Sequence, residues 1–91
     1  MAPAELEALL LTHPGIADAA VIGTYDDNGN EVPHAFVVRH PTARTLTENE
    51  ILLHVAERVA PYKRVRRITF VDTVPRAASG KILRRQLREH T

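Results

Sequence analysis

The sequence contains no cysteine and only four aromatic side chains in 91 residues. The absence of cysteine excludes a disulfide framework and a thiolate nucleophile. No apolar run approaches the roughly 20 residues that span a bilayer, and no signal-peptide pattern opens the chain. We therefore expect a soluble, cytoplasmic protein without a membrane partner.

The length and composition predict one domain with a modest core. Apolar residues make up 44% of the chain and charged residues 25%. A chain of this size is small for a self-sufficient enzyme. Since it also starts directly in a predicted helix, we expect it to be an excised part of a larger protein.

The net charge of +1 conceals an asymmetry along the chain. Residues 1–57 hold two basic and nine acidic side chains, whereas residues 58–91 hold ten basic and two acidic ones. A basic surface of this kind attracts an anionic partner. Nucleic acid, a phosphate-bearing cofactor and an acidic protein surface all satisfy that condition, and so does an ordinary solvated face without a partner.

Metal binding and carboxylate-based acid–base chemistry have little support in the sequence. The five histidines show no i+3 or i+4 spacing, and no cysteine accompanies them. Metal-binding motifs usually require such spacing, so we expect no metal site. Glu5 and Glu7 lie on different sides of a predicted helix and do not form a catalytic pair.

The first half of the chain predicts a helix followed by an antiparallel hairpin. Pro3 suits the first turn of a helix, and the helix ends before the segment 13–15, His-Pro-Gly. Two apolar segments, Ala19–Gly23 and Ala35–Arg39, flank an Asn28-Gly29 turn signal. Such a pattern is typical of a β-hairpin.

The second half predicts a helix, a strand and a final helix. Thr47 and Glu50 form a capping box, and the helix that they open ends at Pro61. The segment Arg67–Val71 alternates polar and apolar side chains and is predicted to be the third strand. The predicted fold is therefore α+β, with a small three-stranded sheet covered by helices in the order α-β-β-α-β-α.

A loop at 75–81, Pro-Arg-Ala-Ala-Ser-Gly-Lys, leads into the predicted final helix. Gly80 permits a tight turn, and Ser79 is expected to cap the helix. Lys81 would then stand beside free N–H groups at the helix start, a place suited to a phosphate or carboxylate. In the final helix we expect Ile82, Leu83 and Leu87 to pack inward and Arg84, Arg85 and Arg88 to remain outside.

The local sequence has two alternatives to an anion-binding lysine. The nucleotide-binding P-loop is excluded because Pro75 replaces its first glycine and Ile82 its magnesium-binding hydroxyl. An ordinary solvent-exposed lysine remains compatible with the local sequence.

The basic stretch 62–67, Tyr-Lys-Arg-Val-Arg-Arg, is a second candidate for binding anions. Nucleic-acid-binding domains usually interleave several aromatic side chains with such charge. Here Phe36 and Phe70 lie in predicted strands, where core packing explains them. We expect no nucleic-acid partner, although the charge alone leaves that possibility open.

The segment 75–88, with its pattern Pro-x-x-x-x-Gly-Lys-Ile-Leu-Arg-Arg-x-Leu-Arg, resembles the terminal motif of the adenylate-forming superfamily. The segments 3–7, 13–14, 18–23, 31–38, 59–63 and 70–75 continue the resemblance over essentially the whole chain. The details are most similar to the 4-coumarate–CoA ligase branch, in particular to bacterial cinnamate/4-coumarate–CoA ligases. The resemblance implies that residues 1–91 are the C-terminal lid domain of an AMP-forming acyl-CoA synthetase.

The resemblance also implies a reaction and a set of functional residues. An acid, ATP and coenzyme A would give acyl-CoA, AMP and pyrophosphate in two steps, between which the lid rotates against an N-terminal domain. Lys81 matches the adenylation lysine of the family. Lys63 and Arg64 are candidates for the phosphates of coenzyme A, and any Mg²⁺ would bind through ATP and the N-terminal domain.

The hinge segment and the ATP- and acid-binding domain of that family have no counterpart in these 91 residues. We therefore expect the chain alone to be inactive. As an alternative function, it is an isolated interaction module, in particular a substrate acetylated at Lys81 by a protein lysine acetyltransferase. The surrounding arginines would then contact that enzyme.

Overall fold

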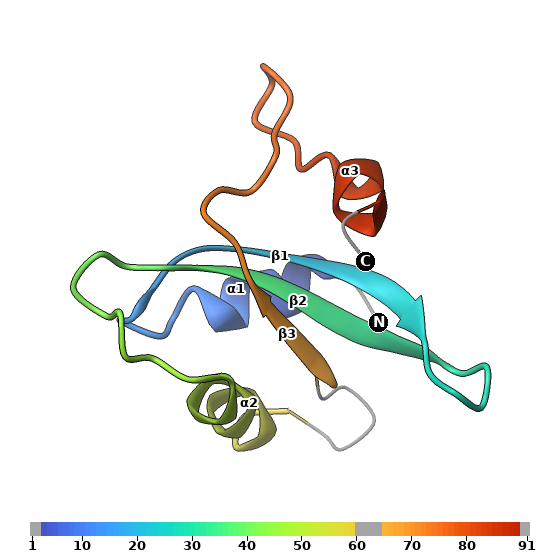
Figure 1. Cartoon of the computed structure of the whole chain (residues 1–91), viewed down its shortest axis with the longest axis horizontal. Coiled ribbons are helices and arrows are strands. Elements are labelled where there is room, and N and C mark those ends of the chain that lie inside the picture. The colour runs from blue at the N-terminus through green and yellow to red at the C-terminus, as the bar shows by residue number, and fades with distance from the viewer. Residues whose placement is uncertain (1–2, 60–64, 90–91) are drawn as a thin grey trace.

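The computed structural model describes residues 3–59 and 65–89 of the chain. The predicted α+β class and element order are confirmed (Figure 1). None of the helices in these residues is long and apolar enough to cross a membrane. The elements are α1 (Pro3–Leu10), β1 (Ile16–Tyr25), β2 (Glu31–Arg39), α2 (Glu48–Ala56), β3 (Arg67–Phe70) and α3 (Arg84–Glu89).

The antiparallel hairpin of β1 and β2 is confirmed, with Val21 opposite Ala35. Both strands are longer than predicted because the connecting turn is tighter. The Asp26 carboxylate accepts hydrogen bonds from the amides of Asn28 and Asn30, both at 2.9 Å. Gly29 has a positive φ of 79°, which glycine adopts at little cost.

Strand β3 lies next to β2 and parallel to it, which gives the sheet order β1-β2-β3. Parallel neighbours require a crossover connection, and α2 lies in that connection. The predicted N-cap is confirmed, since the Thr47 side chain accepts a hydrogen bond from the Glu50 amide at 3.3 Å.

The sheet is covered on both faces, so the molecule has two small cores. On one face α1 and α2 bury Leu6, Leu10, Ile51 and Val55 against strand residues that include Val21 and Val37. On the opposite face α3 and the segment before it contribute Leu87 and Val74, which pack on Ala20, Ile22 and Phe36. Figure 1 shows α3 on the side of the sheet away from α2.

His34 is a buried polar side chain in β2, with 2% of its surface exposed. Its Nε2 lies 2.7 Å from the Thr69 Oγ1, and its ring stacks on Phe36 with centroids 4.5 Å apart. Within the described residues its Nδ1 has no hydrogen-bond partner. Burial, followed by the charge of Arg67, lowers the pKa of His34.

The fold also brings together two histidines that show no pairing in sequence. The rings of His13 and His54 meet edge to face with centroids 4.9 Å apart. Burial and then the charges of Arg58 and His13 lower the pKa of His54. The described residues nevertheless hold no group of three side chains suited to a metal ion.

We expect the free energy of unfolding to decrease as the pH falls from about 7 to about 5. His34 and His54 have pKa values below their ordinary 6.5 in the folded state, so the unfolded chain binds protons more readily. The folded state keeps its full stability well above pH 6.5, where both histidines are neutral in the folded and the unfolded chain. The stability declines as the pH falls below that value, because the unfolded chain takes up protons first. Urea unfolding at the two pH values measures the loss. His34→Gln keeps a hydrogen-bonding group near Thr69 but does not titrate, so it should reduce the loss; an unchanged loss would contradict this role of His34.

Candidate functional site

The segment Pro75–Leu83, which we call the Lys81 hairpin, folds back on itself. Arg76 and Ile82 form an isolated antiparallel bridge. The Ala77 amide donates to the Lys81 carbonyl at 2.8 Å, and the Leu83 amide donates to the Pro75 carbonyl at 2.9 Å. A conformation closed by several backbone bonds holds Lys81 at a defined place.

Gly80 closes the tip of the Lys81 hairpin. Its φ is 88°, a value that costs a residue with a side chain about 1–2 kcal/mol. Its amide donates to the Ala77 carbonyl at 2.8 Å. The tight turn predicted at this glycine is therefore confirmed.

The prediction that Ser79 caps the final helix is wrong. Helix α3 begins only at Arg84, and Ser79 is an exposed turn residue. The bridge between Arg76 and Ile82 keeps the chain extended up to Leu83, so the helix starts later than its apolar pattern suggests. Lys81 consequently lies on the returning arm of a hairpin and not at a helix N-terminus.

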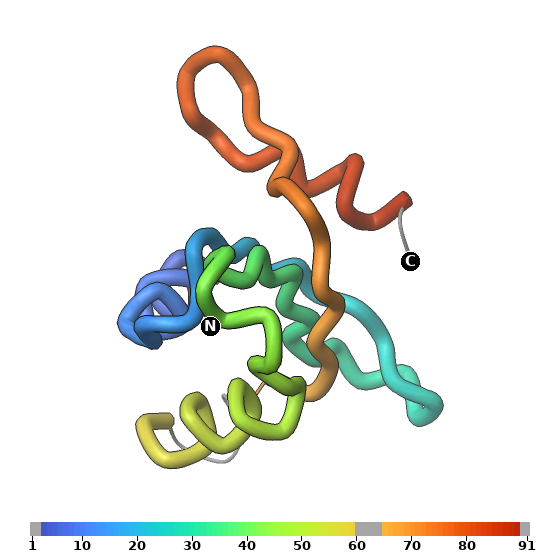
Figure 2. The backbone as a smooth tube through the Cα atoms, turned by 60° about the vertical axis from the view of Figure 1, so that its left-hand side comes forward, coloured from blue at the N-terminus to red at the C-terminus, as the bar shows by residue number. Residues whose placement is uncertain are grey.

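The Lys81 side chain is exposed. Within the described residues its ammonium group has no hydrogen-bond or ion-pair partner. Figure 2 shows the Lys81 hairpin, in orange, standing away from the sheet. An ammonium group on a projecting hairpin that is closed by backbone hydrogen bonds is suited to binding an anion on another surface.

Helix α3 is attached to the free edge of β1 by two arginines. The Arg84 guanidinium donates to the Val21 carbonyl at 2.7 Å and to the Glu7 carboxylate at 2.6 Å. Glu7, only 8% exposed, also accepts the Val21 amide at 2.8 Å. Arg88 donates to the Gly23 carbonyl at 2.9 Å. These contacts satisfy polar groups that an edge strand would otherwise leave unpaired.

The prediction that Arg84 remains outside is wrong, because Glu7 neutralises it in a half-buried contact. Arg88 is exposed as predicted but bonds to β1, and Arg85 is exposed. Leu87 is buried as predicted, whereas Ile82 and Leu83 are half-buried and precede the helix. The sequence signal that could have indicated a buried partner for Arg84 was Glu7, a carboxylate one helical turn from the apolar Leu10.

The other predicted anion-binding residues, Lys63 and Arg64, lie outside the described residues. Their described neighbours Arg66 and Arg67 line a hollow of about 520 Å³ together with Tyr25 and Asn30. This hollow is at the turn end of the β1–β2 hairpin. Asp26 and Glu31 also line the hollow, so it carries charges of both signs. The two predicted residues stay untested.

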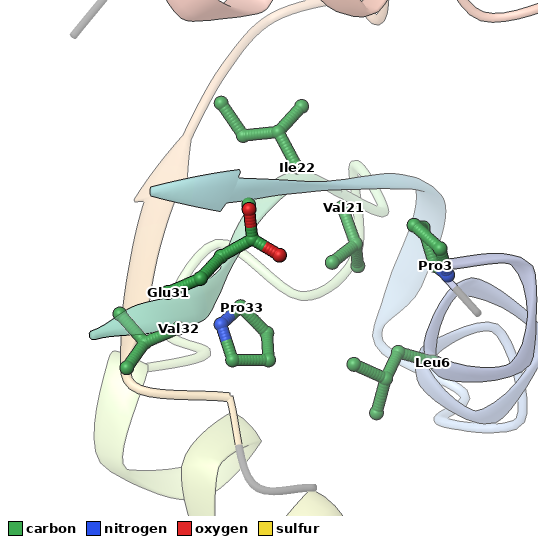
Figure 3. A pocket seen from close by; sticks show the side chains of 8 residues that line it. Pro3, Leu6, Val21, Ile22, Glu31, Val32 and Pro33 are labelled. Carbon is green, nitrogen blue, oxygen red and sulfur yellow. The ribbon is translucent and has the colours of Figure 1, made fainter. Parts of the chain in front are cut away.

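A second, smaller pocket of about 260 Å³ lies between the start of α1 and the β1–β2 hairpin (Figure 3). Its lining is mostly apolar, and Glu31 supplies a carboxylate. Glu31 occupies the space beside Gly23, where an added Cβ would lie 2.8 Å from the Glu31 Cδ. No lining residue comes from the Lys81 hairpin, so pocket and lysine are separate features.

Comparison with known proteins identifies the family of this chain. Residues 5–81 match the model of the AMP-binding enzyme C-terminal domain, so the chain belongs to that family. 4-Coumarate–CoA ligase-like 9 of Oryza sativa subsp. japonica is 58% identical over 89 residues, covering 98% of this chain and 16% of the rice protein. 4-Coumarate–CoA ligase 2 of Nicotiana tabacum is 53% identical over 88 residues, covering 97% of this chain and 16% of its own length.

A solved structure shares the fold. The o-succinylbenzoate CoA synthetase of Bacillus subtilis, in complex with an acyl-adenylate intermediate, is 40% identical with a TM-score of 0.86. The match covers 97% of this chain and 18% of that one. The two curated relatives are plant proteins; they support the 4-coumarate ligase branch, and the bacterial affiliation stays a prediction.

Gly80→Ala should loosen the Lys81 hairpin because alanine disfavours the positive φ by about 1–2 kcal/mol. Faster amide hydrogen exchange at Ala77 and Leu83 would report the loosening. Gly29→Ala is the matched control, since Gly29 also has a positive φ and open space around it. It should leave exchange at Ala77 and Leu83 unchanged. Unaltered exchange in Gly80→Ala would contradict a hairpin closed by this glycine.

Proposed function

We propose that this domain is the mobile lid of an AMP-forming acid–CoA ligase, with Lys81 as its catalytic residue. The reaction converts an acid, ATP and coenzyme A to acyl-CoA, AMP and pyrophosphate. The observation that carries the proposal is the exposed Lys81 ammonium, which has no partner in the described residues and is presented by a hairpin of defined geometry. Family membership supplies the class of reaction.

Lys81 would act in the first step. When the acid carboxylate attacks the α-phosphate of ATP, two negatively charged groups approach each other. A cation between them reduces their repulsion and stabilises the charge of the transition state. An ammonium group with no internal partner can make that contact without breaking an ion pair.

The second step, attack of the coenzyme A thiol with release of AMP, needs a different face of the domain. A lid that swings against the N-terminal domain would withdraw Lys81 and bring basic side chains to the phosphates of coenzyme A. We assign this contact to Lys63 and Arg64. The support for this assignment is the density of basic residues in the segment 63–67 of the sequence. Any Mg²⁺ would be held through ATP and the N-terminal domain.

The acid is proposed to be of the 4-coumarate or cinnamate type, because the similar plant proteins are named 4-coumarate–CoA ligases or ligase-like. The chain spans only 16% of the length of these curated relatives, and an acid pocket would lie in the remainder. The proposed partner is accordingly an N-terminal domain of the same ligase, in the cytoplasm. The 91 residues alone should not catalyse the reaction.

Lys81→Ala in a full-length ligase that carries this domain should slow acid-dependent exchange of pyrophosphate into ATP by about 10²- to 10³-fold. Thioester formation from supplied acyl-adenylate and coenzyme A should be spared. Arg85→Ala is the control, since Arg85 is an exposed cation on α3 with no assigned role in the first step. Equal damage to both half-reactions by Lys81→Ala would overturn the assignment.

The second candidate function is a protein lysine acetyltransferase substrate modified at Lys81. Its support is again the exposed side chain on a projecting hairpin. Acetylation removes the positive charge and would therefore switch off the first step.

Incubation of the 91-residue chain with acetyl-CoA and a candidate acetyltransferase, followed by mass spectrometry, tests this candidate. We expect the acetyl group on Lys81 and its loss in Lys81→Arg. Lys63 is the other lysine in the chain and serves as an internal control for non-selective transfer. Label on Lys63 but absent from Lys81 would count against the candidate.

A further inference from the structure

The geometry points to Arg76 as a positioning residue for Lys81, a role that rests on the function proposed above. Arg76 lies on the outgoing arm of the Lys81 hairpin, opposite Ile82. Its guanidinium spans the hairpin and the sheet, so that one side chain connects the loop that bears Lys81 with the body of the domain. We call this pair of contacts the Arg76 brace.

The Arg76 brace consists of two hydrogen bonds from different nitrogens. One Nη donates to the Gly80 carbonyl at 2.9 Å, and the other donates to the Asp18 Oδ1 at 2.8 Å. Asp18 lies in β1 and is itself fixed, because the same Oδ1 accepts the Ala19 amide at 2.9 Å. Arg76 thus ties the hairpin tip to Asp18 in the first strand, a residue 58 positions from Arg76 in sequence.

The carbonyl that Arg76 holds belongs to the peptide unit directly before Lys81. The carbonyl directly after the Lys81 Cα is held by the Ala77 amide at 2.8 Å. Since peptide units are planar, fixing both carbonyls fixes the backbone on either side of the Lys81 Cα. The direction in which the lysine side chain leaves the hairpin is then determined, and only its own torsions remain free.

Loss of the Arg76 brace should affect the reaction rate much more than the global stability of the domain. The Arg76 and Asp18 side chains are 38% and 30% exposed, and ion pairs at such places contribute little to global stability because solvent screens them. Misplacement of a catalytic group by about 1 Å, in contrast, can cost about 10²-fold in rate. Removal of the brace should therefore slow the reaction while the domain stays folded.

Arg76→Lys and Asp18→Asn are the informative variants. Lysine retains the positive charge but has a single ammonium in place of the planar fork that spans both acceptors. Asparagine retains the shape of Asp18 without its charge. Arg85→Lys is the matched control, because Arg85 is an exposed arginine of the same region that takes no part in the brace.

In the full-length ligase, Arg76→Lys should lower kcat of the pyrophosphate-exchange half-reaction by about 10- to 100-fold. KM for ATP and for the acid should stay unchanged, and thioester formation from supplied acyl-adenylate should be spared. Asp18→Asn should have a smaller effect in the same direction, and Arg85→Lys should have none. A rise in KM without a fall in kcat would overturn the positioning role, since it would mean that Arg76 binds substrate directly.

Amide hydrogen exchange in the 91-residue chain provides a readout that does not depend on the proposed function. Arg76→Lys should accelerate exchange at Ala77 and Leu83 by about tenfold, and Arg85→Lys should not. Unchanged exchange would overturn the brace even if activity fell. Accelerated hydrogen exchange in Arg76→Lys with unchanged pyrophosphate exchange in the full-length ligase would overturn the positioning role. The proposed function is tested separately by Lys81→Ala in the pyrophosphate-exchange assay.

Discussion

The structure depends on how the free edge of β1 is satisfied. An edge strand presents unpaired N–H and C=O groups, and here side chains from both ends of the chain bond to them. The Glu7 carboxylate accepts the Val21 amide, and Arg84 donates to the Val21 carbonyl and to Glu7. Because a nearly buried carboxylate requires such partners, α1 and α3 are placed relative to each other on β1. The position of α3, in turn, sets where the Lys81 hairpin leaves the sheet.

The same contacts change the meaning of the charge asymmetry. An acidic first half and a basic second half suggest a surface for an external anion, but part of this charge is neutralised inside the domain. Glu7 pairs with Arg84, and Asp18 pairs with Arg76. Lys81 differs from these arginines, since its ammonium has no partner within the described residues. Which of the described basic side chains stay available to an external anion is therefore decided by the fold and not by the net charge.

The proposed site would be complete only against another surface. The Lys81 hairpin projects from the domain (Figure 2), and neither described pocket includes its residues. A projecting cation has little influence on a substrate in open water, where a unit charge at about 4 Å contributes only about 1 kcal/mol. Its effect would become large inside a closed, water-excluded site. Such a design agrees with a domain that spans 16% of the length of its relatives.

The fold class, the order of elements, the turn glycine Gly80 and the lysine that follows it could all be predicted from the sequence. These features follow from local rules: apolar periodicity, capping and the conformational freedom of glycine. Three features emerge only from the folded domain: Ser79 is a turn residue, α3 starts at Arg84, and Arg84 and Arg76 form ion pairs with carboxylates of the same domain. For the two arginines the reason is distance along the chain, because Arg84 lies 77 residues from Glu7 and Arg76 lies 58 residues from Asp18. A contact of that separation depends on the packing of the whole sheet, and no local pattern encodes it.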